Sequence, residues 1–504
     1  MLYFVLLLIF SGCAQRSTAN EVSSDSKPSA VWFEKARGRI YVFRGDQFEI
    51  FDSIPGYCIK RNSSFYRFPE DLRQEFINKI MSPSEGSRSV FEESYGKIVE
   101  SESGAYYEKK GERNYLSKME SLPEECLEAT PKIRLSLANF EALVKIFQHF
   151  YPDLSARGVD WKKTVIDGRK NFEKVHTQSQ FLSAVKTFLA PLRDSHVKVF
   201  FYTGSKRKLE PEKIVDWETT EGMIPDVYKH TCHAGKSCYE TQKKNYWSMA
   251  TKFLDPRSLH CVKAGTVLNG DACLNPKLLW VWGTFDEAKL NFQGQKIAYI
   301  AFRQIKDLVN PKTKNADRAA EFDGLLNVMI HDLQETGAVI LDNRLNEGGS
   351  DEFSKLLAAR MSTEKAFAYE IWPKQDPEHK VRKFIAPAVG KPMLIKPTAL
   401  LMDVFTGSAA EMLVLFLQTQ KHVVKMGRPT EGIFSSMLSM ELSNGLVVTL
   451  PFQVTVDAEG KMMEGRGIVP HQIVDFNDPS SFDFIIKLLI KSQRRHDGRL
   501  HPRR

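Results

Sequence analysis

The chain has 504 residues, of which 42 % are hydrophobic and 26 % are charged, and its formal net charge is +8. This length allows several domains, and this composition excludes a fibrous or wholly disordered protein. The last fourteen residues hold six Lys or Arg and one Asp, which leaves a local charge of +5. Because the remainder is close to neutral, we do not expect nucleic acid to be a partner.

The chain begins with an apolar segment that predicts export. Residues 1–12 are too short to span a bilayer as a stable anchor and are typical of a signal peptide. Small residues precede Cys13, which resembles the cleavage box of a bacterial lipoprotein. Cys13 would then be lipidated, residues 13–30 would form a polar tether, and the protein would be anchored at the cell envelope, facing the periplasm or the exterior. No Lys or Arg precedes the apolar run, so a plain secretory signal or a start codon placed too late stays open.

Six further cysteines favour disulfide bonds, because an even number in an exported chain is typical of a disulfide framework. Their pairing is open among fifteen connectivities. A zinc site is the alternative, since three histidines lie near some of these cysteines, but no CxxC spacing occurs and we expect no metal. The residues concerned are Cys58, Cys126, Cys232, Cys238, Cys261 and Cys273, with His230, His233 and His260.

The pattern of apolar residues changes along the chain and predicts five regions after the tether. Residues 31–130 contain short β-like runs. Apolar residues at helical spacing predict a bundle over 131–200. Alternating strand and helix patterns after 293 predict parallel strands with right-handed crossovers. The predicted regions are the N-terminal β-containing region 31–130, the bundle 131–200, a cysteine-bearing insertion 201–292, a β/α catalytic domain 293–491 and a basic tail 492–504.

A serine lies where a predicted strand, 399–404, meets a predicted helix, 409–420. Ser408 could be a nucleophile held out of the sheet, with the amide of Ala409 stabilising an oxyanion, as in a nucleophile elbow. It could equally be a helix N-cap, a position that serine favours.

Three other segments carry groups that could complete such a site. Gly348, in the sequence "ILDNRLNEGG", could bring a second oxyanion amide close to a ligand, or serve only a tight turn. His196, in "DSHV", could be a general base, although most single histidines are not. Glu464 precedes a glycine turn and could orient a histidine, or could be an ordinary loop acid.

Taken together, these segments resemble the tail-specific, or C-terminal processing, serine peptidases. The resemblance rests on "ILDNRLNEGG", on "TGSAAE" around Ser408, on "GRPTEG" at 427–432 and on their order. It implies an α/β, Clp-protease/crotonase-like domain and cleavage of a protein or peptide through an acyl-enzyme, with no cofactor. The Ser/Lys branch carries a lysine where this chain has Ile433. "DSHV" and "MEGRGIVP" instead resemble the tricorn-core branch.

That branch implies a role for each matched residue. Ser408 would be the nucleophile and His196 the base, and Ser195 would relay between His196 and Glu464. The amides of Gly348 and Ala409 would form the oxyanion hole. His471 stands where the family usually has an aspartate, which keeps open a non-catalytic binding protein on the same scaffold. A crotonase-type enzyme acting on acyl thioesters is a third reading, against which export argues.

Overall fold

The structure is a computed structural model. It describes residues 28, 30–44, 47–61, 98–101, 104–109, 112–127, 136–201, 238–275, 277–286, 296–314, 317–476, 478 and 480–500. The predicted signal peptide, Cys13 and most of the tether therefore lie outside the described residues. The chain divides into two compact units, of which the first comprises residues up to Glu34, Ile40–Ile50 and Asn62–Leu122, and the second comprises the rest.

The first unit is antiparallel β structure. Strand β7 pairs with β1 on one side and with β6 on the other, and β6 pairs with β5. The buried carboxylate of Glu34 accepts hydrogen bonds from the hydroxyls of Tyr41 and Tyr107, at 2.6 and 3.2 Å. The strands of this unit are β1 (Ala30–Glu34), most of β2 (Arg39–Arg44), the first half of β3 (Gln47–Ile54), β5 (Ile98–Ser101), β6 (Gly104–Lys109) and β7 (Glu112–Met119).

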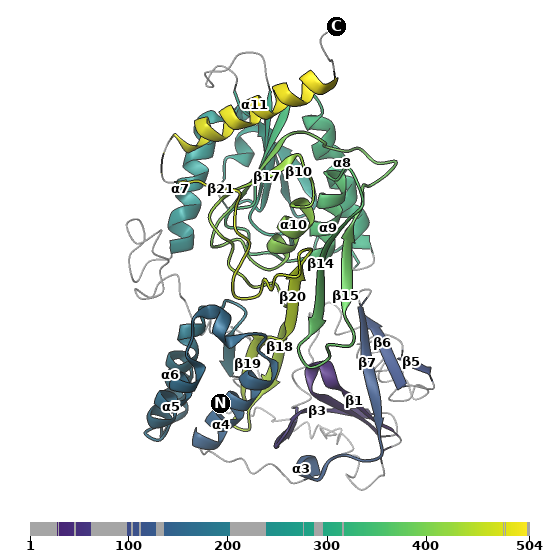
Figure 1. Cartoon of the computed structure of the whole chain (residues 1–504), viewed down its shortest axis with the longest axis vertical. Helices are drawn as coiled ribbons and strands as arrows, with labels where there is room; N and C mark the ends of the chain where they lie inside the picture. Colours follow the sequence, from purple (N-terminus) through teal and green to yellow (C-terminus); the bar gives the residue numbers. More distant parts are fainter. Residues whose placement is uncertain are drawn as a thin grey trace, which may run out of the picture. The chain divides into compact units, whose positions relative to one another are not determined.

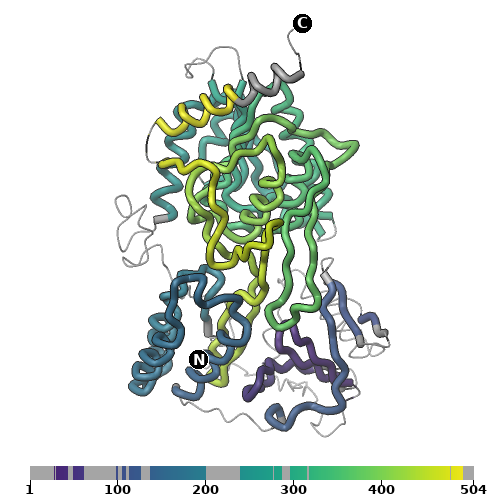
Figure 2. The backbone as a smooth tube through the Cα atoms, viewed as in Figure 1, coloured from purple at the N-terminus to yellow at the C-terminus, as the bar shows by residue number. Residues whose placement is uncertain are grey.

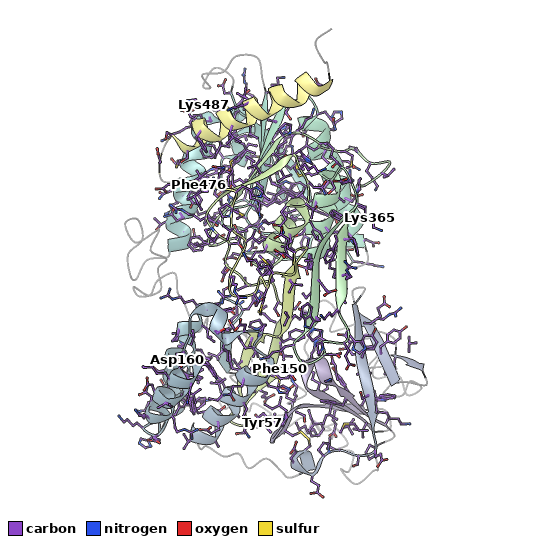
Figure 3. The ribbon with its side chains drawn as sticks, in the orientation of Figure 1. Tyr57, Phe150, Asp160, Lys365, Phe476 and Lys487 are labelled. Atoms are coloured by element: carbon purple, nitrogen blue, oxygen red, sulfur yellow. A yellow bond between two sulfur atoms is a disulfide. The ribbon has the colours of Figure 1, made fainter. Side chains whose placement is uncertain are left out.

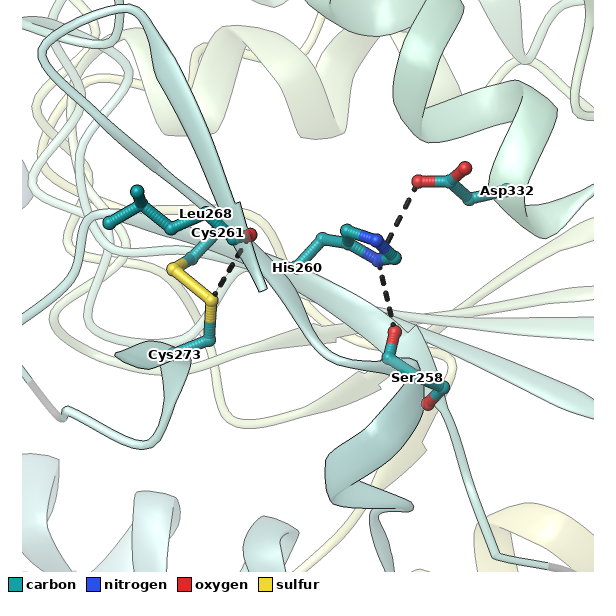
Figure 4. The surroundings of a disulfide bond; sticks show 6 residues. All are labelled: Ser258, His260, Cys261, Leu268, Cys273 and Asp332. Atoms are coloured by element: carbon teal, nitrogen blue, oxygen red, sulfur yellow. Dashed lines mark hydrogen bonds and ion pairs between the residues drawn. A yellow bond between two sulfur atoms is a disulfide. The ribbon is translucent and has the colours of Figure 1, made fainter. Parts of the chain in front are cut away.

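The second unit opens with a disulfide-linked hairpin. The end of β3 pairs with β4 (Tyr57–Lys60). Cys58 of β4 is bonded to Cys126 of the short helix α3 (Glu124–Leu127). A second disulfide joins Cys261 to Cys273 (Figure 4). Disulfide bonding is thus confirmed for four of the six cysteines, while Cys232 lies outside the described residues.

The predicted helical bundle is present. Helix α4 (Ser136–Phe150) packs against α5 (Trp161–Phe172) and α6 (Gln178–Leu189) through aromatic rings. The Phe140 ring stacks on Phe172 with centroids 4.5 Å apart. Helix α5 is capped by Asp160, and α6 begins with a capping box, which explains where these helices start. Two 3₁₀ turns, η3 (Leu154–Arg157) and η4 (Ala190–Leu192), precede α5 and follow α6.

An eight-stranded sheet forms the centre of the second unit, in the order β10-β9-β11-β12-β13-β16-β17-β21. Strands β12, β13, β16, β17 and β21 are parallel, as the β/α pattern predicts. The sheet starts before the predicted boundary at 293, because β9, β10 and β11 extend it with antiparallel pairs. The strands are β9 (His260–Lys263), β10 (Thr266–Asn269), β11 (Trp280–Thr284), β12 (Ile297–Phe302), β13 (Ala338–Asp342), β16 (Thr398–Met402), β17 (Val423–Gly427) and β21 (Gln472–Ile473).

Helices cover both faces of this sheet (Figure 1). Alternate strand residues pack into two separate apolar clusters, because successive side chains of a strand point to opposite faces. One cluster includes helices α8, α9 and α10, and the other includes α7 and α11. None of the helices in the described part of the chain is long and apolar enough to cross a membrane. The helices are α7 (Cys238–Phe253), α8 (Arg318–Leu333), α9 (Asp351–Arg360), α10 (Ala409–Leu417) and α11 (Ser481–Leu500).

Two three-stranded sheets complete the unit, in the orders β15-β14-β20 and β18-β19-β8. Figure 2 traces the excursion of the chain from β17 through these sheets and back to β21. The turn at Asn444-Gly445, a dipeptide typical of tight hairpin turns, joins β18 to β19. The strands are β8 (Lys198–Phe201), β14 (Ala366–Pro373), β15 (Val381–Ile385), β18 (Met437–Glu441), β19 (Leu446–Pro451) and β20 (Gln453–Asp457).

One of these strand pairs joins distant parts of the sequence. Strand β8 starts two residues after His196 and pairs with β19, where Lys198 lies opposite Thr449. The segment that follows the helical bundle is thereby fixed to the C-terminal part of the chain. The predicted domain boundaries stay a prediction.

Candidate active site

Ser408 lies between β16 and α10 in an uncommon backbone conformation, with φ 55° and ψ −127°. A positive φ is strained for any residue with a Cβ atom, and such strain often accompanies function. The Ser408 side chain is partly exposed, although the helix that it begins is buried along its whole length. This strand–turn–helix geometry is that of a nucleophile elbow.

Glu411, one turn into α10, holds this elbow against the segment Thr430–Ser435, which we call the junction segment. Its buried carboxyl group accepts hydrogen bonds from the amide of Ser408, at 3.2 Å, and from the amides of Gly432 and Ile433, both at 2.8 Å. The Thr430 hydroxyl is a fourth donor. Burial raises the pKa of Glu411 to about 7, against the opposing effect of these hydrogen bonds.

Gly348 lies directly against the elbow. A Cβ atom at this position would stand 2.8 Å from the Ser408 Cβ and 2.7 Å from the Ala409 nitrogen, and φ is +89°. Only glycine fits there. The structure therefore brings the two predicted oxyanion residues together. The Gly348 amide donates to the Asn346 side chain at 3.0 Å, so it would have to leave this partner to meet an oxyanion.

The loop that carries Gly348 is held by a pair of asparagines. The Asn346 side chain donates to Asn343 at 2.8 Å, and the Asn343 side chain donates to the Ala410 carbonyl at 3.1 Å. The Gly407 amide in turn donates to the Asn346 carbonyl at 2.9 Å. These bonds fix the glycine loop to the start of α10.

A buried ion-pair network lies at the start of the same loop. The Asp342 carboxylate accepts from Arg344 at 2.7 and 2.8 Å, from Arg303 at 3.1 Å and from the Tyr299 hydroxyl at 2.6 Å. Burial would raise the pKa of Asp342, but the two guanidinium groups outweigh it and hold this pKa well below its usual range. The Arg344 guanidinium also lies 4.1 Å from the ring centroid of Phe476, which is labelled in Figure 3.

His196 is buried in the turn between η4 and β8. Its amide donates to Asp194 at 2.8 Å, and its carbonyl accepts from the Thr449 hydroxyl at 2.7 Å. Burial lowers the pKa of the imidazole to about 4, opposed by the Asp194 charge and by a hydrogen bond with the Ser435 backbone. Among the described residues, no hydrogen-bond partner contacts Nδ1. The ring is therefore neutral near pH 7 and has one nitrogen without a partner.

Glu464 approaches the same backbone from another direction. Its Oε2 atom accepts from the amides of Phe434 and Ser435, at 3.0 and 2.9 Å. Its Oε1 atom is buried and has no hydrogen-bond partner within the described part of the chain. Burial, and then the Asp194 charge, raise the pKa of Glu464 well above its usual range. His196 and Glu464 thus share Ser435.

Ser195 attaches to the junction segment by its backbone. Its amide donates to Oε1 of Glu431 at 3.3 Å, and the Glu431 amide donates to the Thr406 carbonyl at 3.0 Å. Ser408, Ser195, His196 and Glu464 are therefore all tied to the six residues of the junction segment. The relay through the Ser195 side chain stays a prediction.

Arg157 is a residue that sequence reasoning missed. Its guanidinium, with 8 % of the side chain exposed, donates to the carbonyls of Glu431 and Gly432 at 3.1 and 2.7 Å. It also lies 3.5 Å from the Asp194 carboxylate, which accepts from the Tyr151 hydroxyl at 2.6 Å. Nothing in the loop around Arg157 signals this role.

Glu411 and Glu431 were missed as well. The spacing of Glu411 from Ser408, which is that of a capping box, could have found it. Glu431 has no such signal. Within the described residues, no group of three His, Cys, Asp or Glu side chains could hold a metal ion.

The fold is similar to that of known proteins. A candidate peptidase from Parabacteroides merdae is 17 % identical, with a TM-score of 0.51, over 70 % of this chain and 96 % of that chain. A mutant of CPAF is 10 % identical, with a TM-score of 0.50, over 72 % and 98 %. The photosystem II D1 C-terminal processing protease is 17 % identical over 71 % and 98 %, with a TM-score of 0.36. The first two likenesses show the fold, and the predicted α/β, Clp-protease/crotonase-like class is confirmed.

A sequence model of a known protein family matches part of this chain. Residues 296–474 match the model of peptidase family S41. This segment contains β12 to β21 and hence both the elbow and the glycine loop. The domain belongs to peptidase family S41, so the chain is a serine peptidase that acts on protein or peptide substrates.

Proposed function

We propose that Ser408 is the nucleophile of this peptidase and that His196 is its general base. The observation that carries the proposal is the attachment of the elbow, the His196 turn and Glu464 to one short junction segment. These groups are far apart in the sequence, and hydrogen bonds join each of them to the same short segment. The strained backbone of Ser408 and the close packing of Gly348 against Ala409 support the same assignment.

Hydrolysis proceeds in two steps. The neutral imidazole of His196 takes the hydroxyl proton as Ser408 attacks the carbonyl carbon, and the amides of Gly348 and Ala409 bind the oxyanion. The imidazolium then protonates the leaving amine. Water, deprotonated by His196, attacks the acyl-enzyme and releases Ser408. Glu464, with Ser195 as a relay, orients the imidazole ring.

Replacement of the nucleophile tests this proposal. We expect Ser408→Ala to lower kcat for casein by about 10³-fold or more, because the covalent route is lost. Ser436→Ala, at an exposed serine just beyond the junction segment, is the matched control and should keep wild-type activity. Equal cleavage by Ser408→Ala and the wild type would refute the assignment.

We further propose that the protein is exported and held at the bacterial cell envelope by a lipid on Cys13. The two disulfides support an oxidising compartment, because such bonds are rare in the cytosol. A lipid on Cys13, the first residue of the tether 13–30, would hold the peptidase at the membrane through a polar linker. Cys13→Ser should move the protein from the membrane fraction to the soluble fraction, and unchanged fractionation would contradict the anchor.

A further inference from the structure

Glu431 differs from the other acids of the candidate site in its exposure. Asp194, Glu411 and Glu464 are at most 1 % exposed. Glu431 is only partly buried, as are Ser408 and Ser195. Of these four acidic residues, Glu431 is therefore the one that is partly exposed, as the nucleophile is.

The Glu431 carboxyl group also has few hydrogen bonds. Oε1 accepts one long bond, from the Ser195 amide at 3.3 Å. Oε2 lies close to Gly407, the residue before the nucleophile. A Cβ atom added to Gly407 would stand 2.7 Å from Oε2. The Glu411 carboxyl group, in contrast, accepts four bonds. Oε2 of Glu431 can thus accept a donor supplied by a ligand.

The third feature of Glu431 is its charge environment. In the part of the chain that the structure describes, no Lys, Arg or His forms an ion pair with it. The charge of Arg157 acts on Glu431, but the Nη1 and Nη2 atoms of Arg157 donate to backbone carbonyls, and Nη2 also lies near Asp194. Burial, together with the charges of Glu411 and Asp194, raises the pKa of Glu431 to about 8, against the Ser195 hydrogen bond and Arg157. A cation from a substrate would relieve this repulsion.

We propose that Glu431 determines specificity, and that its carboxylate binds the ammonium or guanidinium group of a substrate lysine or arginine close to the scissile bond. The inference rests on the proposed function, because it places the substrate over Ser408. A charge-assisted hydrogen bond at Oε2 would favour such peptides over uncharged ones of the same shape.

Paired peptides test the proposal. Each pair carries lysine or its uncharged isostere norleucine at one of the three positions on either side of the scissile bond. At pH 8.5 we expect kcat/KM to favour lysine by about 10- to 100-fold at one position. Glu431→Gln should reduce this ratio to about threefold or less, through a larger loss of kcat/KM for the lysine peptides than for the norleucine peptides. Glu459→Gln, at an exposed loop acid, is the control and should leave the ratio unchanged.

A pH series adds a second measure. The wild-type preference for lysine should increase from pH 6 to pH 9, because the carboxyl group must be ionised to bind a cation, and the preference of Glu431→Gln should not change. Cleavage of both peptides at equal rates at every position would overturn the specificity proposal and leave the peptidase intact. Equal loss of both activities in a folded Glu431→Gln would also overturn it, since Glu431 would then only position Ser195. The proposal that Ser408 is the nucleophile is tested separately, by the activity of Ser408→Ala.

Discussion

The charges around Asp342 and those around Arg157 differ in balance. Around Asp342, one carboxylate has two guanidinium partners and four side-chain donor atoms. Around Arg157, four carboxyl groups belonging to Asp194, Glu411, Glu431 and Glu464 share one guanidinium. The first group is charge-satisfied and remains ionised at every ordinary pH. In the second, burial raises the pKa of Glu411 to about 7, that of Glu431 to about 8 and that of Glu464 well above its usual range, so these three groups hold protons near neutrality.

This difference indicates that the two groups have different roles. The Asp342 network fixes the glycine loop and contributes to the stability of the fold. An unsatisfied network has pKa values displaced towards neutrality, which is typical of functional sites. The contrast can be tested on each side.

The largest effect is expected from the balanced side. Arg344→Met would leave the Asp342 carboxylate buried with a single guanidinium, and should lower the free energy of unfolding by about 3–5 kcal/mol. Chemical denaturation measures it. Arg169→Met is the control. The Arg169 side chain is 46 % exposed and is paired with Glu141, so its removal should change the free energy of unfolding by about 0–1 kcal/mol. Similar losses in both variants would contradict the role of the network.

The next effect concerns the pH dependence of catalysis. The base must be neutral, and burial lowers the pKa of His196 to about 4. The acid limb of kcat/KM should therefore lie near pH 4, whereas an ordinary histidine would place it near 6.5. Circular dichroism at each pH verifies that the protein stays folded. An acid limb at pH 6.5 or above would show that His196 is not the base or is not buried as described.

The smallest effect concerns stability against pH on the unbalanced side. The folded-state pKa of Glu431 is raised to about 8, above its unfolded value near 4.5. The folded state retains this proton, so stability is fully present below pH 4.5 and decreases as pH rises through 8. Glu431→Gln should remove part of that decrease, raising Tm at pH 9 relative to the wild type by roughly 1 °C. A larger decrease in Glu431→Gln than in the wild type would contradict the sign.

Much of the fold could be predicted from the sequence because its patterns are local. The strand at 338–342 and the helix from Ala409 show continuous apolar runs, and the parallel order follows from their alternation. The sheet strands β9 to β11 could not be predicted, because short strands near cysteines and glycines have no clear period. The pairing of β8 with β19 could not be predicted either, because the two strands are far apart in the sequence.

Some residues of the candidate site could be predicted because they lie in short, recognisable motifs next to a turn. These residues are Ser408, Gly348 and His196. Arg157 and Glu431 do not, because their roles depend on segments that are more than 200 residues apart in the sequence. Charge balance around a buried group is a property of the folded chain, and no single stretch of sequence displays it.

The most direct test of the central claim is to label the nucleophile with a fluorophosphonate and locate the adduct by mass spectrometry. We predict one adduct, on the peptide that contains Ser408, absent in Ser408→Ala and formed at least about 100-fold more slowly in His196→Ala. A folded wild-type protein that forms no adduct, or a Ser408→Ala variant labelled as fast as the wild type, would contradict the account.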